Sequence, residues 1–196
     1  MAFWLAVVEG ALEEQIAASF ARHFGFSFGA IANKRGGQNF WREAHRFDQA
    51  ARHRGPVLGL VDLEHAPCAS GLIVQKLGRM PHGNFALRVA VRTMESWLLA
   101  DTRGIAKYLR VAAKDVPNAP DAEGDPKQRL VNLARKSGKR EIRDGLVPPD
   151  DVRGAKVGRE YLPVMGEFVR SHWDIGAAAE RSPSLRRALA AIEARL

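Results

Sequence analysis

Pro56-Val57-Leu58-Gly59-Leu60-Val61-Asp62 is the clearest strand in the 196-residue sequence, because it is apolar throughout and ends in a carboxylate. A strand without polar positions inside it is typical of a sheet that is covered on both faces. Other strands are expected at 3–8, 26–32 and 85–92, with helical segments at 11–24, 39–53 and 71–77. This alternation predicts right-handed crossovers and a mostly parallel, four-stranded α/β sheet flanked by helices.

The second half of the chain predicts helices rather than strands. After a helix at 94–100, Asp101 is expected to cap the next helix, and Pro126 stands where a later helix would begin. Further helices are expected at 102–109, 126–136, 159–172 and 182–196. We therefore expect one domain, in which residues 1–110 form the α/β core and residues 111–196 form a helical C-terminal extension.

Charge and composition limit the class of protein. The chain carries 30 Lys+Arg and 22 Asp+Glu, a net charge of +8 and a sequence pI of about 10.1. This excess favours a polyanionic partner, nucleic acid above all, although a basic surface without a partner explains it equally well. No apolar run reaches the ~18–20 residues of a membrane span, so we expect a cytoplasmic protein that does not bind membranes. The single cysteine, Cys68, excludes an internal disulfide and a thiolate zinc cluster.

Acidic side chains follow three of the four expected strands. Residues 1–100 contain only eight acids, and five of them stand at or just after strand ends: Glu9, Glu13, Asp62, Glu64 and Glu95. In an open parallel sheet, ligands bind outside the carboxyl ends of the strands. Several carboxylates held close together repel one another, and hard oxygen ligands suit Mg²⁺ or Mn²⁺. The pattern therefore predicts a divalent-metal site at this edge.

Each acid also has a plainer interpretation. Glu9 could simply end a strand, and Glu13 could stabilise a helix N-terminus by its charge. Asp62 could begin a loop, and Glu95 could be an ordinary charge in a first helical turn. These alternatives are reasonable one by one, but acids at three strand ends of one edge are less easily explained by coincidence.

The motifs around these acids resemble those of Toprim domains. Val7-Val8-Glu9-Gly10-Ala11-Leu12-Glu13 resembles their opening, in which a strand ends in Glu-Gly and a helix follows. Asp62-Leu63-Glu64 is similar to their Asp-x-Asp motif, with Glu in place of the second Asp. Thr93-Met94-Glu95 is similar to the Ser-x-Glu motif of the Toprim domain in overcoming-lysogeny-defect (OLD) nucleases, which also carries a later lysine.

A resemblance to the bacterial domain-of-unknown-function 4276 family, a Toprim-like group, covers nearly the whole chain. Its most specific segment is residues 91–101, around Glu95 and Trp97, and further similar segments are 8–13, 61–62, 125–127 and 182–185. The resemblance implies a Toprim-like (Rossmann-like) fold and metal-dependent phosphoryl transfer. It also implies nuclease action on DNA or RNA, with a role in anti-phage defence beside an ATPase by analogy.

The resemblance assigns roles to particular residues. In a two-metal arrangement, Glu9, Glu13 and Asp62 would hold one cation, and Glu64 and Glu95, with the Thr93 hydroxyl, the other. Glu9 and Asp62 would thus be central to catalysis. A lysine would stabilise charge growing on the phosphate, and the two candidates are Lys127, favoured by its motif, and Lys156, which has glycines nearby.

Two basic segments are candidates for contacts with a phosphate backbone. One is the loop that contains Lys34 and Arg35, and the other is the run that contains Arg135, Lys136, Lys139 and Arg140. Such contacts hold nucleic acid without reading its sequence, and a solvated surface is the alternative. Two rival functions remain open: a non-catalytic subunit that docks a partner ATPase or nucleic acid, and a primase-like nucleotidyl transferase, which the missing zinc-binding cysteines disfavour.

Overall fold

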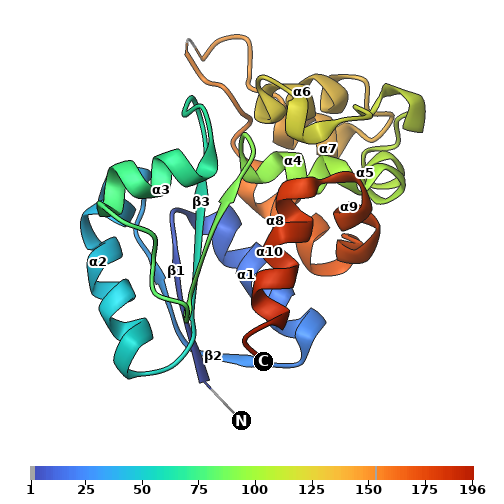
Figure 1. Cartoon of the computed structure of the whole chain (residues 1–196). Helices are drawn as coiled ribbons and strands as arrows, with labels where there is room; N and C mark the ends of the chain where they lie inside the picture. Colours follow the sequence, from blue (N-terminus) through green and yellow to red (C-terminus); the bar gives the residue numbers. More distant parts are fainter. Residues whose placement is uncertain (1–2, 153) are drawn as a thin grey trace. The chain divides into compact units, whose positions relative to one another are not determined.

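A computed structural model describes residues 3–152 and 154–196, and its centre is a four-stranded sheet. The strands are β1 (Phe3–Val8), β2 (Ser27–Asn33), β3 (Val57–Asp62) and β4 (Phe85–Ala90). The helices between them are α1 (Ala11–Phe24), α2 (Gly37–His53) and α3 (Ala69–Leu77). Figure 1 shows α2 and α3 on one side of the sheet and α1 and α10 (Pro183–Glu193) on the other.

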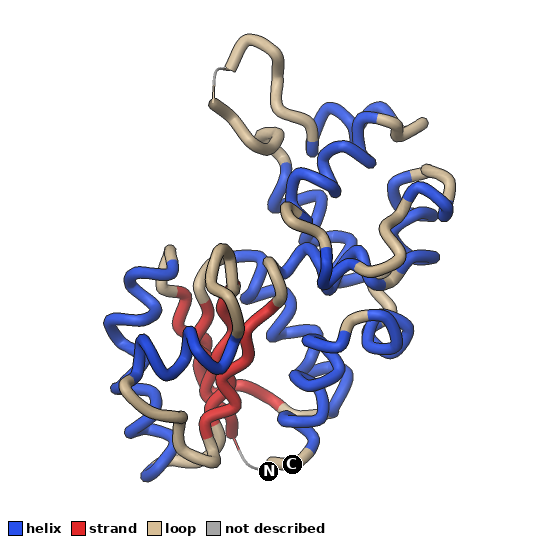
Figure 2. The backbone as a smooth tube through the Cα atoms, turned by 45° about the horizontal axis from the view of Figure 1, so that its top comes forward, coloured by secondary structure: helices blue, strands red, loops and turns tan. Residues whose placement is uncertain are grey.

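The sheet is parallel throughout, in the order β2-β1-β3-β4. Figure 2 shows these strands side by side, with helices on either side of them. The α/β class and the mostly parallel four-stranded sheet expected from the sequence are therefore confirmed. Since all four strands run the same way, their carboxyl ends lie at one edge.

Apolar side chains bury β3 on both faces, as its composition predicts. Val57, Leu58, Leu60 and Val61 are at most 1% exposed. Gly59 makes close packing possible here, because a Cβ atom at this position would lie 2.8 Å from side-chain atoms of Phe85 and Leu87 on β4. β3 therefore occupies the middle of the core, where its last residue, Asp62, reaches the edge of the sheet.

Helices make up most of the rest of the chain. They are α4 (Met94–Ala100), α5 (Thr102–Leu109), α6 (Pro126–Arg135), α7 (Arg140–Leu146), α8 (Tyr161–Ser171) and α9 (Ile175–Arg181), with short 3-10 turns at Ala113–Asp115 and Pro120–Ala122. Asp101 caps α5 by accepting from the Gly104 N–H at 2.9 Å, which confirms that prediction. The sequence did not predict α7 or α9 as separate helices.

The chain divides into two compact units. The sheet unit comprises the residues up to Met94 together with Ser184–Leu196, and the helical unit comprises Glu95–Pro183. The sequence placed the division near residue 110 and assigned every later residue to one helical extension. The structure divides the chain earlier and groups α10 with the sheet. Within the described part of the chain, no helix is both long and apolar enough to cross a membrane.

Candidate functional site

Glu9 and Asp62 meet at the carboxyl edge of the sheet. Glu9 follows β1 and Asp62 is the last residue of the neighbouring strand β3, and the register of the two strands pairs Val8 with Leu60. The Asp62 N–H lies 3.4 Å from Glu9 Oε2, so the Glu9 carboxylate reaches across to the end of β3. Their proximity follows from the parallel order of the strands, and the structure brings together these two predicted site residues.

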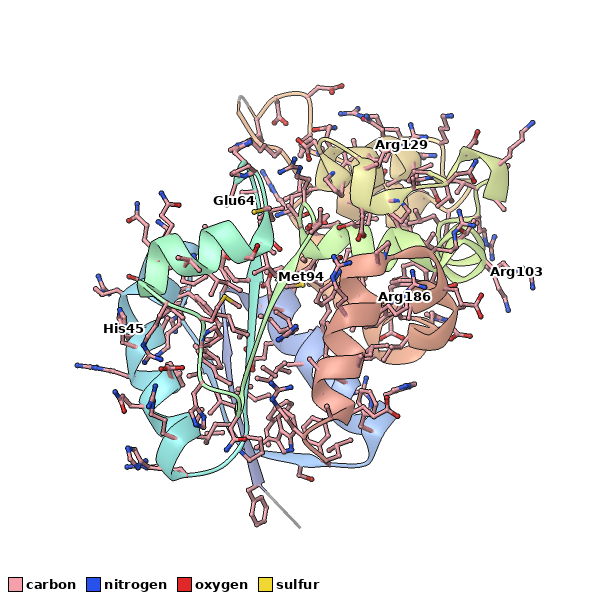
Figure 3. The ribbon with its side chains drawn as sticks, viewed as in Figure 1. His45, Glu64, Met94, Arg103, Arg129 and Arg186 are labelled. Atoms are coloured by element: carbon pink, nitrogen blue, oxygen red, sulfur yellow. The ribbon has the colours of Figure 1, made fainter. Side chains whose placement is uncertain are left out.

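An open cavity of about 530 Å³ lies at this edge, inside the sheet unit. Three predicted site residues line it: Glu9, Asp62 and Glu64. Glu64 is exposed on the loop after β3, with a backbone φ of +51° (Figure 3). The other walls include Trp41 from α2 and His65 from the same loop. The cavity is thus a carboxylate-bearing recess large enough for a small ligand or part of a polymer.

The Asp62 carboxylate also orders the start of α4. Asp62 Oδ1 accepts from the Met94 N–H at 2.9 Å, so this first residue of the helix is held at the end of β3. An aspartate at a helix N-terminus is favourable because the exposed N–H groups carry positive partial charge. Asp62 therefore serves the local fold as well as the cavity.

Arg92 holds the loop that carries Asp62 and Glu64. Its guanidinium donates to the carbonyl of Glu64 at 3.1 Å and to that of Ala66 at 2.8 Å. The Glu64 N–H in turn donates to the Arg92 carbonyl at 3.0 Å. The sequence analysis assigned no role to Arg92, although it lies in the segment 91–101, because a single arginine gives no sign of a partner 28 residues away.

The start of α2 places backbone N–H groups beside Glu9. The Gly36 N–H donates to the Glu9 carbonyl at 2.8 Å, and a Cβ atom at Gly37 would lie 3.1 Å from Glu9 Oε1. Glycine at position 37 therefore lets the helix approach the carboxylate closely. The N-terminus of α2 therefore lies beside the Glu9 side chain.

Glu13 is not one of the residues that line this cavity. It is 8% exposed in the first turn of α1, and its Oε2 would lie 2.9 Å from a Cβ atom at Gly10, so the side chain folds back toward the start of its own helix. This placement suits the plainer interpretation, in which the charge stabilises the helix N-terminus.

Glu95 belongs to the helical unit and is engaged there by two side chains. Its Oε1 accepts from the Tyr161 hydroxyl at 2.8 Å and lies 3.3 Å from Lys127 Nζ. Glu95 is 1% exposed. The structure thus brings together two predicted site residues, Glu95 and Lys127, and adds Tyr161, which the sequence analysis missed because it stands 66 residues later in the chain.

The remaining predicted ligand and lysine are placed as follows. Thr93 is half-buried just after β4, and Lys156 is exposed in a loop of the helical unit. Among the residues described, no three or more His, Cys, Asp or Glu side chains are grouped so that they could hold a metal ion. The structure brings Glu9, Asp62 and Glu64 to one cavity, and the five-acid metal site expected from the strand ends stays a prediction.

The predicted basic contacts differ in how exposed their charges are. Lys34 forms an ion pair with Glu43 at 2.8 Å and lies 5.0 Å from the centre of the Phe47 ring, whereas Arg35 is exposed. The hydrogen bond from Lys34 lowers the pKa of the Glu43 carboxyl. In the helical unit, Lys136 pairs with Asp115 and Arg140 with Asp144, while Arg135 is exposed and Lys139 is half-buried.

Comparisons with known proteins leave the family open. No family model matches the chain, and no curated protein matches it. One solved structure that matches is the C-terminal region of the Burkholderia pseudomallei OLD protein, with 14% identity and a TM-score of 0.46, covering 100% of each chain. A match at this identity and score carries no conclusion about function. Membership of the domain-of-unknown-function 4276 family therefore stays a prediction.

Proposed function

We propose that this chain is a metal-dependent phosphoryl-transfer enzyme, and more narrowly a nuclease that acts on DNA or RNA. The observation that carries the proposal is the pair of carboxylates, Glu9 and Asp62, at adjacent strand ends in one open cavity. Ligand sites of parallel α/β sheets lie at this edge. The Toprim-like motifs in the sequence support the same reaction class.

The donors present fit a magnesium or manganese ion. Mg²⁺ in enzymes keeps several waters and is held by one or two carboxylates together with substrate phosphates. Glu9 and Asp62 supply that number of carboxylates, and the cavity of about 530 Å³ has room for waters and a phosphate. A third acidic ligand is therefore not required for a cation of this kind.

Each residue of the cavity has a proposed task. Glu9 and Asp62 would hold the cation, with Glu9 fixed beside the start of α2 and Asp62 fixed by the Met94 N–H. A bound divalent ion would neutralise phosphate charge and lower the pKa of a bound water. Glu64 is proposed as a ligand of a second ion, and Glu13, Thr93, Glu95, Lys127 and Lys156 stay predictions.

Nucleic acid is the proposed substrate class. The net charge of +8 favours a polyanion, and Arg35 and Arg135 are exposed where a phosphate backbone could contact them. Work beside an ATPase in anti-phage defence is a finer part of the proposal, and it rests on the sequence resemblance alone. A cytoplasmic location is also proposed, and it rests on the composition of the sequence.

Asp62→Asn tests the proposal. The amide oxygen of asparagine can still accept from the Met94 N–H, so the start of α4 is preserved while the negative charge is removed. We expect the variant to lose cleavage of labelled DNA and RNA in the presence of Mn²⁺ or Mg²⁺. Calorimetry should also show Mn²⁺ affinity reduced by about 10-fold or more, because a direct ligand matters at least as much as the groups that support it.

Glu193→Gln is the matched control, since Glu193 is an exposed carboxylate of the sheet unit that does not line the cavity. It should cleave and bind Mn²⁺ like the native protein. If a folded Asp62→Asn protein keeps both properties, the catalytic proposal is wrong.

One observation favours the non-catalytic alternative. Glu95 already has Lys127 and Tyr161 as partners, so its charge is satisfied without a metal. A docking subunit with an inherited acidic edge would bind nucleic acid or a partner ATPase without cleaving. The native protein decides between the two: binding of labelled DNA or RNA with no cleavage at any Mn²⁺ concentration would favour the docking subunit.

A further inference from the structure

A second cavity of the sheet unit is lined by arginines instead of acids. It measures about 380 Å³ and lies between α3, β4 and α10. We call it the arginine pocket, and its walls include Cys68, Ser70, Ile73, Met80, Arg88 and Arg187. It shares no described lining residue with the carboxylate cavity: Ala69, Ser70 and Ile73 of α3 line the arginine pocket, whereas Leu72, Gln75 and Lys76 line the other. The two sites are therefore separate.

Arg88 is the unusual residue of this pocket. It is half-buried on β4, and within the part of the chain that the structure describes its Nε is buried without a hydrogen-bond partner. Burial lowers the pKa of its guanidinium, and the nearby charges of Arg195 and Arg187 lower it further. A cation withdrawn from water beside like charges is costly unless an anion accompanies it.

The protein supplies no such anion among the residues described. Neither Arg88 nor Arg187 forms an ion pair with a carboxylate of residues 3–152 or 154–196, and the pocket walls contain no Asp or Glu. Arg195, the third cation, donates from Nε to the Gly83 carbonyl at 2.6 Å, which leaves its charge without a neutralising partner. The positive charge of the pocket therefore remains available to a ligand.

We propose that the arginine pocket binds a phosphate monoester, with the guanidinium groups of Arg88 and Arg187 on the phosphate. A guanidinium matches phosphate oxygens through paired N–H donors, and a phosphate monoester carries a charge of about −1.5 to −2 at pH 7. That charge balances two arginines, whereas a single carboxylate balances one. Ser70 also lines the wall, with its hydroxyl 3.7 Å from Cys68 Sγ.

The size of the pocket calls for more than a phosphate ion. A volume of about 380 Å³ is roughly that of a dozen water molecules at ~30 Å³ each. Ile73 and Met80 supply apolar surface, and Met80 is 57% exposed, so it can adapt to a flat or irregular group. This chemistry suits a mononucleotide or the 5′-phosphorylated end of a strand, which share a phosphate beside a base. The inference does not depend on the proposed nuclease activity.

Cys68 provides a built-in reporter of occupancy. Its thiol lines the pocket, is exposed, and accepts from the Gly71 N–H at 3.3 Å. That hydrogen bond, with a second from Ser70, lowers the pKa of the Cys68 thiol and favours the reactive thiolate. Since Cys68 is the chain's single cysteine, alkylation of the intact protein occurs at one known place.

The test measures the rate of Cys68 alkylation by iodoacetamide, using intact mass, while inorganic phosphate or 5′-AMP is added at constant ionic strength. We expect saturable protection of at least about fivefold, reached at a lower concentration of 5′-AMP than of phosphate. Arg187→Gln removes an exposed side chain that the fold does not need, and it should weaken protection by about 10-fold or more. Arg88→Met should do the same while keeping the apolar part of the side chain.

Arg186→Gln is the matched control, because it removes the same charge from the neighbouring position of α10, outside the pocket walls (Figure 3). It should be protected like the native protein. A 5′-phosphorylated and a 5′-hydroxyl oligonucleotide of one sequence then distinguish the two sources of the phosphate. Protection by the phosphorylated strand identifies a strand end, and protection by 5′-AMP without either strand identifies a small molecule.

Three results would overturn the proposal. The first is no protection by phosphate or 5′-AMP at millimolar concentrations. The second is equal protection in the native protein and in Arg187→Gln and Arg88→Met. The third is that both oligonucleotides protect Cys68 and do so equally, which would mean that the pocket contacts a strand without requiring a terminal phosphate.

Discussion

Asp48 lies on the inner face of α2 with only 1% of its surface exposed, and it accepts hydrogen bonds from the Arg79 guanidinium and the His82 N–H. Removing one partner of a buried pair usually costs about 3–5 kcal/mol. Because the Arg79 side chain is 44% exposed, water can replace part of what it loses. We therefore expect Asp48→Ala to lower the free energy of unfolding by about 3 kcal/mol, the lower end of that range, in urea denaturation.

Asp144→Ala is the comparison variant, since Asp144 pairs with Arg140 where both side chains are more than half exposed. Exposed pairs contribute about 0–1 kcal/mol, so this variant should remain close to the native protein. Equal stability of the two variants would show that the Asp48 contacts do not hold the loop before β4 in solution.

At the level of single residues, the sequence located those acids whose position follows from strand order. The positions of Glu9 and Asp62 were predictable because parallel strands end at one edge of the sheet. Glu64 lines the same cavity because it stands two residues after Asp62. Lys127 was a candidate from its motif, but Tyr161 was not predictable as a partner of Glu95, because it reaches Glu95 only through the packing of later helices. A sequence pattern gives the place of a charge along an element, but not what packs against it.

The next prediction concerns two aspartates that cap helices of the helical unit. Asp101 is 2% exposed and accepts from two N–H groups, Gly104 at the start of α5 and Asp174 before α9, both at 2.9 Å. Asp125 caps α6 through a single exposed bond to the Gln128 N–H at 2.9 Å. Asp101→Ala would leave two N–H donors without their acceptor. A buried donor that loses its acceptor costs about 1–3 kcal/mol of stability, whereas loss of an ordinary helix cap costs about 1 kcal/mol.

We therefore expect Asp101→Ala to lower the free energy of unfolding by about 3 kcal/mol and Asp125→Ala by about 1 kcal/mol, measured by urea denaturation. The order of the two variants is the decisive result. A larger loss for Asp125→Ala would mean that the Asp101 contacts do not join the starts of α5 and α9.

Elements with a long apolar period were predicted well, and short charged ones were not. The bounds of β1 and α1 agree with the sequence pattern, because the apolar run of β1 stops at Glu9-Gly10 and the apolar stripe of α1 stops at Gly25. α7 and α9 have seven residues each, too few for a repeating stripe, and α7 begins inside a basic run. In both helices, packing within the helical unit decides the structure more than local sequence does.

At the scale of the whole chain, the C-terminal residues belong to the same compact unit as the N-terminal strands. The sheet unit is completed by Ser184–Leu196, after the chain has passed through the helical unit. Arg195 donates from Nε to the Gly83 carbonyl, in the loop before β4. The sequence could not show this, because a helix predicted at 182–196 has the same apolar stripe whichever unit it packs against.

This return path makes a prediction about the sheet. In α10, Leu185, Ala188 and Ile192 are 0% exposed, and burial of a Leu or Ile side chain stabilises by about 1.5–3 kcal/mol. Removing residues 184–196 should therefore lower the free energy of unfolding by about 3–6 kcal/mol, and hydrogen exchange should quicken at the amides of β3 and β4. The double variant Arg186→Gln/Glu193→Gln, which changes only exposed side chains of the same helix, should leave both measurements unchanged. If the truncated chain loses protection in the helical unit alone and keeps it in β3 and β4, α10 does not stabilise the sheet, and the division expected from the sequence is the better description.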